Sequence, residues 1–300
     1  QDYPKDKWEV ILMNDHSTDG GVALIEKSNL SINCQVVNTV GQGKKAAIKE
    51  AWGIAKHECI VHTDADCSMG PMWLHSMASP LASPSSDFVA GPVRYRKQTT
   101  FFERLMGLEF AGLVAIGGAH IQWNRAMICN GANLAYKRKW IERLDLNESK
   151  ASGEDVFLMK SIAVGGGSLS FCKDKKAMVD TDGPENLNRF VQQRLRWASK
   201  NTAYAGRVNN AILIATWLWN CLLLVCLFLM SKIAVTVFAF CVLIKFFAEE
   251  HFYRKTASFF SLKKVWLSLF FGQLFHILYI ALLPLASKLF KYKWKERKWS

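Results

Sequence analysis

Short apolar runs alternate with segments of mixed polarity along the chain as far as Val208. The runs predict strands over residues 8–13, 34–38, 59–66 and 88–93. Strands that alternate with helical segments are typical of βαβ units, so we expect an α/β fold with a mostly parallel sheet flanked by helices. Ligands of such sheets bind beyond the carboxyl ends of the strands. Candidate site residues should therefore follow strands.

The segments between and after these strands have helical composition, apart from a strand at 129–136 that a glycine-containing turn interrupts. The apolar positions of the segment 99–113 indicate an amphipathic helix that packs in the core rather than against lipid. One helix is predicted to end near residue 28, and another is predicted to begin near residue 71. The other helices are predicted over 44–56, 99–113, 188–204, and from 153 to the glycines 165–167.

The last third of the chain has a different pattern. Residues 211–230 carry no charge, Lys245 alone interrupts the apolar run 233–248, and a third run spans 265–287. A helix of about 20 residues crosses the roughly 30 Å of hydrocarbon in a bilayer. None of these runs shows the polar stripe of a helix on a soluble core. We therefore predict membrane helices here.

The chain thus divides into an α/β domain over 1–208 and a membrane domain over 209–300, with two to three apolar helices and a basic tail. The formal net charge of +13 does not indicate nucleic-acid binding, because many basic residues gather beside the apolar runs. Tyr292, Trp294 and Trp299 suit the interfacial belt of a membrane protein. No zinc-finger spacing or RNA-binding aromatic motif accompanies the charge.

Asp64 and Asp66 are expected to close the strand at 59–66. Alternate residues of a strand share a face, so two carboxylates would stand together at the carboxyl edge of the sheet. Hard oxygen ligands suit a divalent cation that also holds a diphosphate, although surface turns often contain Asp-x-Asp. His62 shares this face, and a hydrogen-bonded core histidine is a simpler interpretation of it than a metal ligand.

Asp15 and Lys44 have both structural and functional interpretations. Asp15 follows the first strand in a turn-rich loop, where it could cap a helix or accept hydrogen bonds from a nucleotide. Lys44 begins a helix after glycines. It could be simply solvated, or it could join the helix N-terminus in binding phosphate oxygens.

Two later motifs are equally open. Acidic residues at a helix start, such as Glu154 and Asp155, complement the helix dipole, but Asp155 could also be a general base. In Gln193-x-x-Arg196-Trp197 the three side chains share a helical face. They could line a diphosphate and sugar site, or they could belong to a basic helix beside the membrane with an interfacial tryptophan.

The five motifs together resemble the family 2 inverting glycosyltransferases. The resemblance rests on their order: Asn14-Asp15-His16-Ser17-Thr18-Asp19, Gly43-Lys44, Asp64-Ala65-Asp66, Gly153-Glu154-Asp155 and Gln193-Arg194-Leu195-Arg196-Trp197. It is closest to the membrane-embedded branch with the cellulose, chitin, hyaluronan and poly-N-acetylglucosamine synthases and ceramide glucosyltransferase. This implies a GT-A fold, a nucleotide-diphospho-sugar donor, expected to be a UDP-sugar, and a lipid or growing glycan acceptor.

The resemblance also implies site residues. Asp15, Lys44 and Asp64 would bind the nucleotide sugar, and Asp66 with Asp64 would hold Mg²⁺ or Mn²⁺. Asp155 would be the catalytic base. The residues implied for the acceptor and diphosphate site are Glu154, Gln193, Arg194, Arg196 and Trp197.

Location and completeness are further expectations. The family's first strand is absent before Gln1, so we expect the chain to be part of a longer protein. Eight scattered cysteines without a Cys-x-x-Cys pair indicate reduced thiols, in keeping with a catalytic domain that faces the cytoplasm from a bacterial inner membrane. Three crossings would leave the basic tail outside, so one apolar segment is expected to lie in the interface or re-enter, unless the missing N-terminus changes the topology.

Two rival functions stay open. A catalytically inactive membrane scaffold or binding subunit could keep the same fold, although it would be expected to lose some of the carboxylates. A transporter is disfavoured, because only Lys245 and His276 lie within apolar runs. The motifs do not specify the sugar, the acceptor, or whether transfer is single or repeated.

Overall fold

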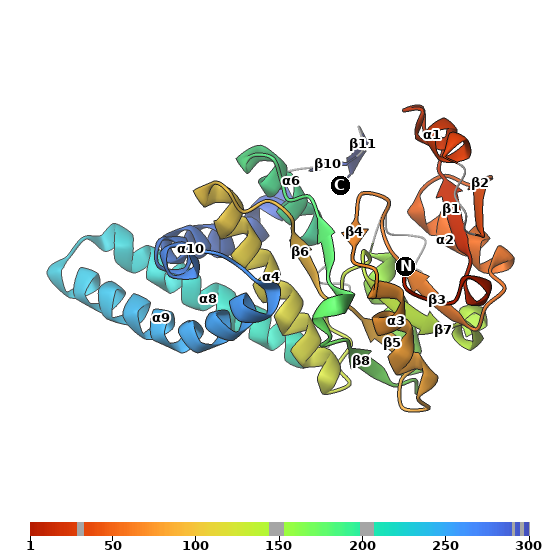
Figure 1. The fold of residues 1–300 in the computed structure, drawn as a ribbon. Coiled ribbons are helices and arrows are strands. Elements are labelled where there is room, and N and C mark those ends of the chain that lie inside the picture. The colour runs from red at the N-terminus through yellow and green to blue at the C-terminus, as the bar shows by residue number, and fades with distance from the viewer. Residues whose placement is uncertain (29–32, 144–152, 199–206, 290–291, 295–296, 300) are drawn as a thin grey trace. The chain divides into compact units, whose positions relative to one another are not determined.

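A computed structural model describes residues 1–28, 33–143, 153–198, 207–289, 292–294 and 297–299. The chain forms two compact units (Figure 1). The first unit contains Gln1–Pro92 and Gly118–Val179, and the second contains Val93–Gly117 and Asp180–Ser300. The division of the sequence at residue 208 stays a prediction.

The first unit begins with a βαβ arrangement. Strands β1 (Val10–Asn14) and β2 (Cys34–Asn38) pair in parallel, with Val10 opposite Cys34. Helix α1 (Gly21–Lys27) lies between them in sequence, and α2 (Lys44–Ile54) follows β2. The predicted strands and helices of this part are confirmed, and their ends differ from the predicted ones by no more than two residues.

A four-stranded sheet forms the core of the first unit, in the order β3 (Cys59–His62), β7 (Leu134–Lys137), β5 (Phe88–Ala90) and β8 (Leu169–Phe171). Strand β7 runs antiparallel to β3 and to β5, whereas β5 and β8 are parallel. The predicted α/β class is therefore confirmed, but this sheet is mixed rather than mostly parallel. Hydropathy fixes which face of a strand is buried and carries no information on its direction.

Tryptophan side chains fasten helices to this sheet. Trp52 of α2 donates from Nε1 to the Tyr136 hydroxyl at 2.8 Å, and Trp73 of α3 (Trp73–Ala78) donates to Asn133 Oδ1 at 3.0 Å. Buried indole N–H groups need such acceptors. The remaining elements of the first unit are η1 (Lys5–Lys7), β4 (Ser68–Met69), η2 (Ser79–Ala82), η3 (Arg138–Arg143), α5 (Glu154–Val164) and η4 (Lys175–Ala177).

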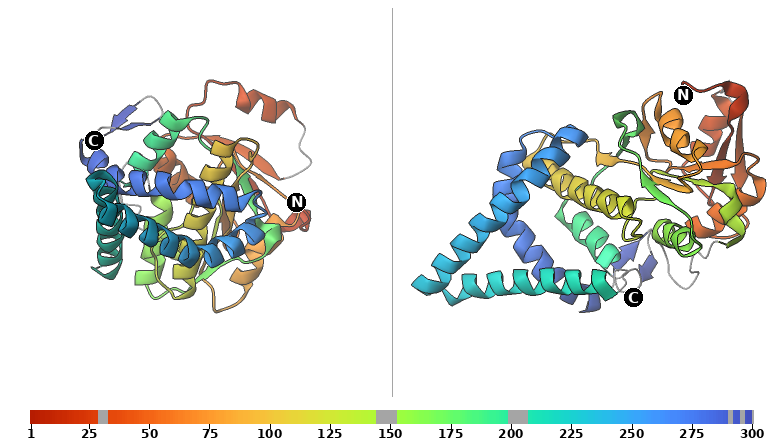
Figure 2. Two further views of the ribbon diagram at one scale, coloured as in Figure 1. Left: turned by 90° about the vertical axis from the view of Figure 1, so that its left-hand side faces the viewer. Right: turned by 90° about the horizontal axis from the view of Figure 1, so that it is seen from below.

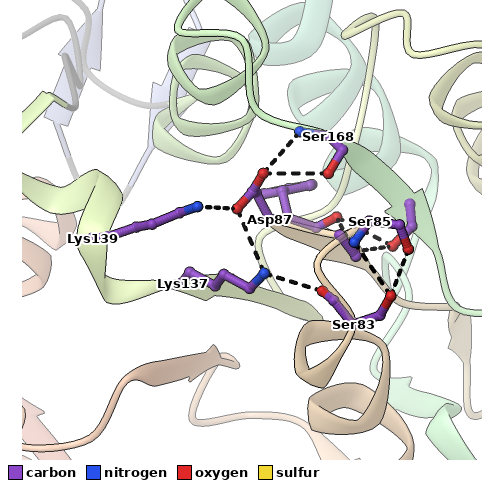
Figure 3. A network of polar contacts seen from close by, with 9 residues as sticks. Ser83, Ser85, Asp87, Lys137, Lys139 and Ser168 are labelled. Carbon is purple, nitrogen blue, oxygen red and sulfur yellow. Dashed lines mark hydrogen bonds and ion pairs between the residues drawn. The ribbon is translucent and has the colours of Figure 1, made fainter.

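Asp87 joins three strands at the end of the sheet where β5 begins (Figure 3). Its Oδ2 accepts from the Ser168 backbone N–H at 3.2 Å, and its Oδ1 lies 2.7 Å from Lys139 Nζ and 3.7 Å from Lys137 Nζ. Burial raises the pKa of this carboxyl, but the hydrogen bonds from Lys139 and Ser168 outweigh it and hold the pKa at about 2. Asp87 therefore stabilises the sheet as a carboxylate.

The second unit consists mainly of helices (Figure 2). Helices α8 (Arg207–Leu229), α9 (Lys232–Phe260) and α10 (Val265–Leu289) pack against one another, and α6 (Leu187–Ala198) packs on α10. The unit also holds β6 (Val93–Tyr95), most of β9 (Val179–Thr181), most of α4 (Phe101–Gln122), and the hairpin of β10 (Tyr292–Trp294) with β11 (Arg297–Trp299).

Several predicted boundaries are wrong for physical reasons. The strand expected over 88–93 is two strands, because Pro92 has no N–H to continue the ladder. The strand expected over 129–136 begins only at Leu134, after a turn. The helix expected over 99–113 continues to Gln122, because Gly117 and Gly118 do not end it. The predicted helix 188–204 is confirmed as far as Ala198, and the rest lies outside the described residues.

Among the described residues, three helical segments are long and apolar enough to cross a membrane: Phe101–Gln122, Asn210–Leu229 and Val265–Ser287. The last two match predicted membrane segments. The first was expected to pack in a core, and half of its most apolar stretch is indeed buried. The predicted segment 233–248 is part of α9, which is not among the three and continues into Glu249, Glu250 and Arg254.

Candidate functional site

Asp15 lies in the loop after β1 and contacts the start of α2. Its Oδ1 accepts a hydrogen bond from the Gly43 backbone N–H at 2.9 Å. Gly43 is the N-cap of α2 and has a φ of 90°, a conformation that side chains other than hydrogen disfavour. Asp15 does not cap α1, whose N-cap is Gly20 and whose first N–H, that of Gly21, donates to Asp19 Oδ1 at 2.9 Å. Asp15 therefore holds the glycine loop that precedes Lys44.

Lys44 is the first residue of α2 and pairs with two carboxylates. Its Nζ contacts Asp64 Oδ1 and lies 3.2 Å from Glu154 Oε1. Burial lowers the pKa of the ammonium, but Asp64 and Glu154 outweigh burial and raise it. Burial raises the pKa of the Glu154 carboxyl, but Lys44 outweighs burial and lowers it. Lys44 and Glu154 are thus both charged at neutral pH, and the solvated interpretation of Lys44 is wrong.

Asp155 follows Glu154 at the start of α5, after the N-cap Gly153. Its Oδ2 accepts from the Gly131 N–H at 3.0 Å, and its Oδ1 accepts from the Val156 N–H at 2.9 Å. A Cβ on Gly131 would stand 3.3 Å from Lys44 Nζ and 3.4 Å from the Asp155 Cβ. Lys44 and Asp155 therefore meet at Gly131, and the absence of a side chain there leaves room for both.

These contacts define an ionic cluster of the first unit, made of Lys44, Asp64, Glu154 and Asp155. Two neighbouring side chains respond to it. Burial and, to a smaller extent, Lys44 lower the pKa of His62 to about 4, so its imidazole is neutral at pH 7, as a core histidine should be. Burial raises the pKa of the Cys129 thiol, and the Asp155 and Glu154 carboxylates add to this effect.

Asp66 takes part in none of the hydrogen bonds and ion pairs recorded for the ionic cluster in the described part of the chain. Asp64 and Asp66 were expected to close strand β3, but this strand ends at His62, so both belong to the turn that follows it. Asp66 is exposed and its Oδ1 lies 3.7 Å from Cys67 Sγ. Residues further along the turn need not share a face, so the argument from strand alternation does not hold there.

The metal prediction can be compared with these donors. In the described part of the chain, no three His, Cys, Asp or Glu side chains are grouped to hold a metal ion. Magnesium sites commonly use one or two carboxylates and complete their shell with substrate phosphates and water. The exposed Asp66 and the half-buried Asp64 supply hard oxygens of that kind, so the residues present fit a cation that binds together with a diphosphate.

The remaining predicted site residues belong to the second unit. Arg194 is 2% exposed and forms an ion pair with Glu109 of α4. Its guanidinium carbon lies 4.1 Å from the centroid of the Trp197 ring. Gln193 accepts from the Tyr95 hydroxyl at 3.2 Å, and Arg196 is half-buried. Trp197 therefore contacts Arg194, three residues earlier, and the choice between a binding site and a basic helix beside the membrane stays a prediction.

Sequence reasoning missed Gly131, Tyr95 and Glu109. Glu109 gave the clearest signal, since it is the only charged residue between Leu105 and Ala119 and an unpaired charge in an apolar helix is costly. Gly131 lies in a short Asn-Gly turn, which indicates a turn but not what packs against it. Tyr95 is the last residue of β6 and carried no signal.

The fold places the chain in a structural class. It has an α/β fold of the GT-A type, and its backbone resembles that of the mannosyltransferase PcManGT from Pyrobaculum calidifontis, solved in complex with GDP-Man and Mn²⁺. The TM-score is 0.53, with 18% identity over 92% of this chain and 80% of that one. At this identity the likeness shows the fold.

Sequence comparison is more specific. Residues 1–145 match the family described as Glycosyl transferase family 2, so this part of the chain is similar to that family. The probable glycosyltransferase YdaM of Bacillus subtilis is 27% identical over 207 residues, which cover 66% of this chain and 49% of that protein. The chain thus spans about half the length of this curated relative. The matches support the prediction that the protein is a glycosyltransferase.

Proposed function

We propose that the protein is a membrane-bound inverting glycosyltransferase that moves a sugar from a nucleotide-diphospho-sugar to a hydroxyl of a lipid or growing glycan. The observation that carries the proposal is the ionic cluster, in which Lys44 of α2 pairs with Asp64 and Glu154 and meets Asp155 at Gly131. A lysine at a helix N-terminus suits phosphate oxygens, and carboxylates suit a cation and a proton.

On the donor side, Lys44 binds the diphosphate, Asp15 contacts the base and Asp64 contacts the nucleotide. The bound PcManGT donor is GDP-Man, and a UDP-sugar is our proposal for this chain from the resemblance of its motifs. Asp66 and Asp64 would hold Mg²⁺ or Mn²⁺, which supplies positive charge for the leaving diphosphate. Lys44 must exchange part of its contact with Asp64 and Glu154 for phosphate oxygens when the donor binds.

On the acceptor side, Asp155 is the general base. The acceptor oxygen forms a bond to the anomeric carbon as the bond from that carbon to the diphosphate oxygen breaks. The hydroxyl proton passes to the Asp155 carboxylate, and the electron pair leaves with the nucleoside diphosphate. A single displacement of this kind inverts the anomeric centre. The N–H groups of Gly131 and Val156 orient the carboxylate for this step.

Glu154, Gln193, Arg194, Arg196 and Trp197 are assigned by the same resemblance to the acceptor and diphosphate site. In the structure Glu154 is buried and paired with Lys44, which favours a role in setting the position of that ammonium. The candidate membrane helices support a location in a membrane, and we propose that the catalytic part faces the cytoplasm, where nucleotide sugars are made. A role in polysaccharide or glycolipid synthesis of the cell envelope follows from that proposal.

The test uses the full-length protein in native membranes, incubated with labelled UDP-glucose, UDP-N-acetylglucosamine and GDP-mannose in turn. Labelled product should form with one donor, and its size shows whether transfer is single or repeated. Asp155→Asn should abolish transfer with little change in donor affinity, since only the base is lost. Full turnover by that variant would reject the assignment of Asp155. A wild-type protein that shows no transfer and no donor hydrolysis would favour an inactive scaffold.

A further inference from the structure

Glu109 occupies an unusual position for a carboxylate. It is the only charged residue between Leu105 and Ala119 in α4, and its side chain is 11% exposed. Both of its oxygens have partners within the second unit. Oε2 pairs with Arg194 of α6, and Oε1 accepts from the Tyr279 hydroxyl of α10 at 2.8 Å. Glu109 thus joins three helices through one side chain.

Arg194 carries the effect of Glu109 to two aromatic rings. Its guanidinium carbon lies 4.1 Å from the Trp197 ring centroid and 4.8 Å from that of Phe190. A buried guanidinium without a counter-ion is strongly disfavoured, so Arg194 keeps this position only while Glu109 is charged. The indole of Trp197 therefore rests on a cation that Glu109 holds in place.

Neighbouring contacts extend the same arrangement. The Trp197 ring lies 6.2 Å from Phe110, the residue after Glu109, and Phe110 stacks on Tyr95 at 4.2 Å between ring centroids. The Tyr95 hydroxyl donates in turn to Gln193. Two of the side chains assigned to the acceptor, Gln193 and Trp197, are thus both positioned from the Glu109–Phe110 turn of α4.

We infer that Glu109 is a positioning residue for the sugar acceptor, acting through Arg194 to fix the indole of Trp197. The inference rests on the proposed function and goes beyond it, because Glu109 belongs to none of the motifs on which that function is based. A purely structural ion pair is the competing explanation, and it predicts different behaviour when both charges are removed together.

A double variant and a matched control variant separate these explanations, whereas the single variant does not. Glu109→Gln leaves Arg194 without its counter-ion, so the loss of folding and the loss of positioning coincide. The double variant Glu109→Gln with Arg194→Met leaves no unpaired charge, and replacement of both partners of a buried ion pair is often neutral for stability. It still lacks the cation beneath Trp197. Tyr279→Phe is the matched control, since it removes the other hydrogen bond of Glu109 and keeps the pair with Arg194.

The measured quantity is the ratio of sugar transfer to donor hydrolysis in native membranes, with the labelled donor that the wild type uses among UDP-glucose, UDP-N-acetylglucosamine and GDP-mannose. Loss of folded protein lowers both rates and leaves their ratio unchanged. A displaced acceptor lowers the ratio, by about tenfold or more where the reacting oxygen is misplaced by an ångström. We expect this fall in the double variant, and partial recovery in Glu109→Asp, but no fall in Tyr279→Phe.

A second readout does not depend on turnover. In protein labelled with 5-fluorotryptophan, the ¹⁹F resonance that Trp197→Phe removes is that of Trp197. It should shift in the double variant and stay in place in Tyr279→Phe. A double variant with a wild-type ratio, or with an unshifted resonance, would overturn the inference. A wild type that neither transfers nor hydrolyses any donor would instead count against the proposed function, while the resonance still tests the role of Glu109.

Discussion

Replacement of Lys44 by methionine removes the cation of the ionic cluster and leaves its carboxylates in place. The free-energy cost falls mainly on Glu154, because its side chain is 9% exposed whereas that of Asp64 is 36% exposed. Removing one partner of a fully buried pair costs about 3–5 kcal/mol, and solvent reduces this where the partners are partly exposed. Lys44 is 38% exposed, so we expect a loss of about 2 kcal/mol at neutral pH.

The pH dependence of this loss has a definite sign. In the wild type the pKa of Glu154 is lowered from 4.5, so its contribution is present above pH 4.5 and is lost as the pH falls below that value. Without Lys44, burial dominates and raises the pKa of Glu154 above that of the unfolded chain. The variant then loses stability as the pH rises through 4.5. The difference between the two proteins should therefore shrink from pH 7 towards pH 4.5.

The assay is thermal unfolding of the detergent-solubilised protein, followed by tryptophan fluorescence between pH 4.5 and 8. A loss of about 2 kcal/mol corresponds to a shift on the order of 5 °C for a domain of this size. Lys44→Met combined with Glu154→Gln should recover most of the shift and remove its pH dependence. A Lys44→Met variant whose deficit is the same at every pH would refute the assignment of the pair.

Three further changes test other parts of the structure. Asp87→Asn should lower the free energy of unfolding by about 1 kcal/mol near pH 6, because solvent around Lys139 weakens the ion pair. Since the pKa of Asp87 is lowered, its contribution is present above pH 3.8 and is lost as the pH falls towards 2, so chemical denaturation should show the deficit vanish over that range. Gly131→Ala should lower transfer about tenfold, since its Cβ meets Lys44 and Asp155, with unfolding nearly unchanged; equal losses in both would contradict the assigned crowding. Chelation of divalent cations should stop transfer reversibly, and undiminished transfer in excess chelator would exclude the metal role of Asp66 and Asp64.

The sequence predicted the first unit well where local pattern and chemistry agree. Strands β1 and β2 and helix α2 were predicted correctly because apolar runs and glycine punctuation mark them. It also predicted that Lys44, Glu154 and Asp155 carry chemistry, although their roles stay proposals. It did not predict that Gly131 stands between Lys44 and Asp155, because a contact across more than eighty residues leaves no local trace.

The direction of β7 and the length of α4 escaped prediction for different reasons. An alternating pattern is the same in either direction, so β7 could not be recognised as antiparallel. Helix α4 was expected to end at residue 113, but it continues through the glycines at 117 and 118, whose low helix propensity tertiary packing overrides. Gly118 approaches Phe171 so closely that a Cβ would stand 2.9 Å from its ring. Such packing is a tertiary contact, which the local pattern of the chain does not show.

Trp197 shows how helical spacing can be correct and its interpretation incomplete. Positions i, i+3 and i+4 place Gln193, Arg196 and Trp197 on one face, and that geometry suggested one shared binding surface. The same spacing also makes Trp197 a neighbour of Arg194, and the buried Glu109 decides which contact forms, because it fixes the guanidinium beside the indole. A lone carboxylate in an apolar helix therefore predicts a buried cation elsewhere in the chain. Here that cation lies within the motif itself, so the motif depends on a residue that its own sequence does not contain.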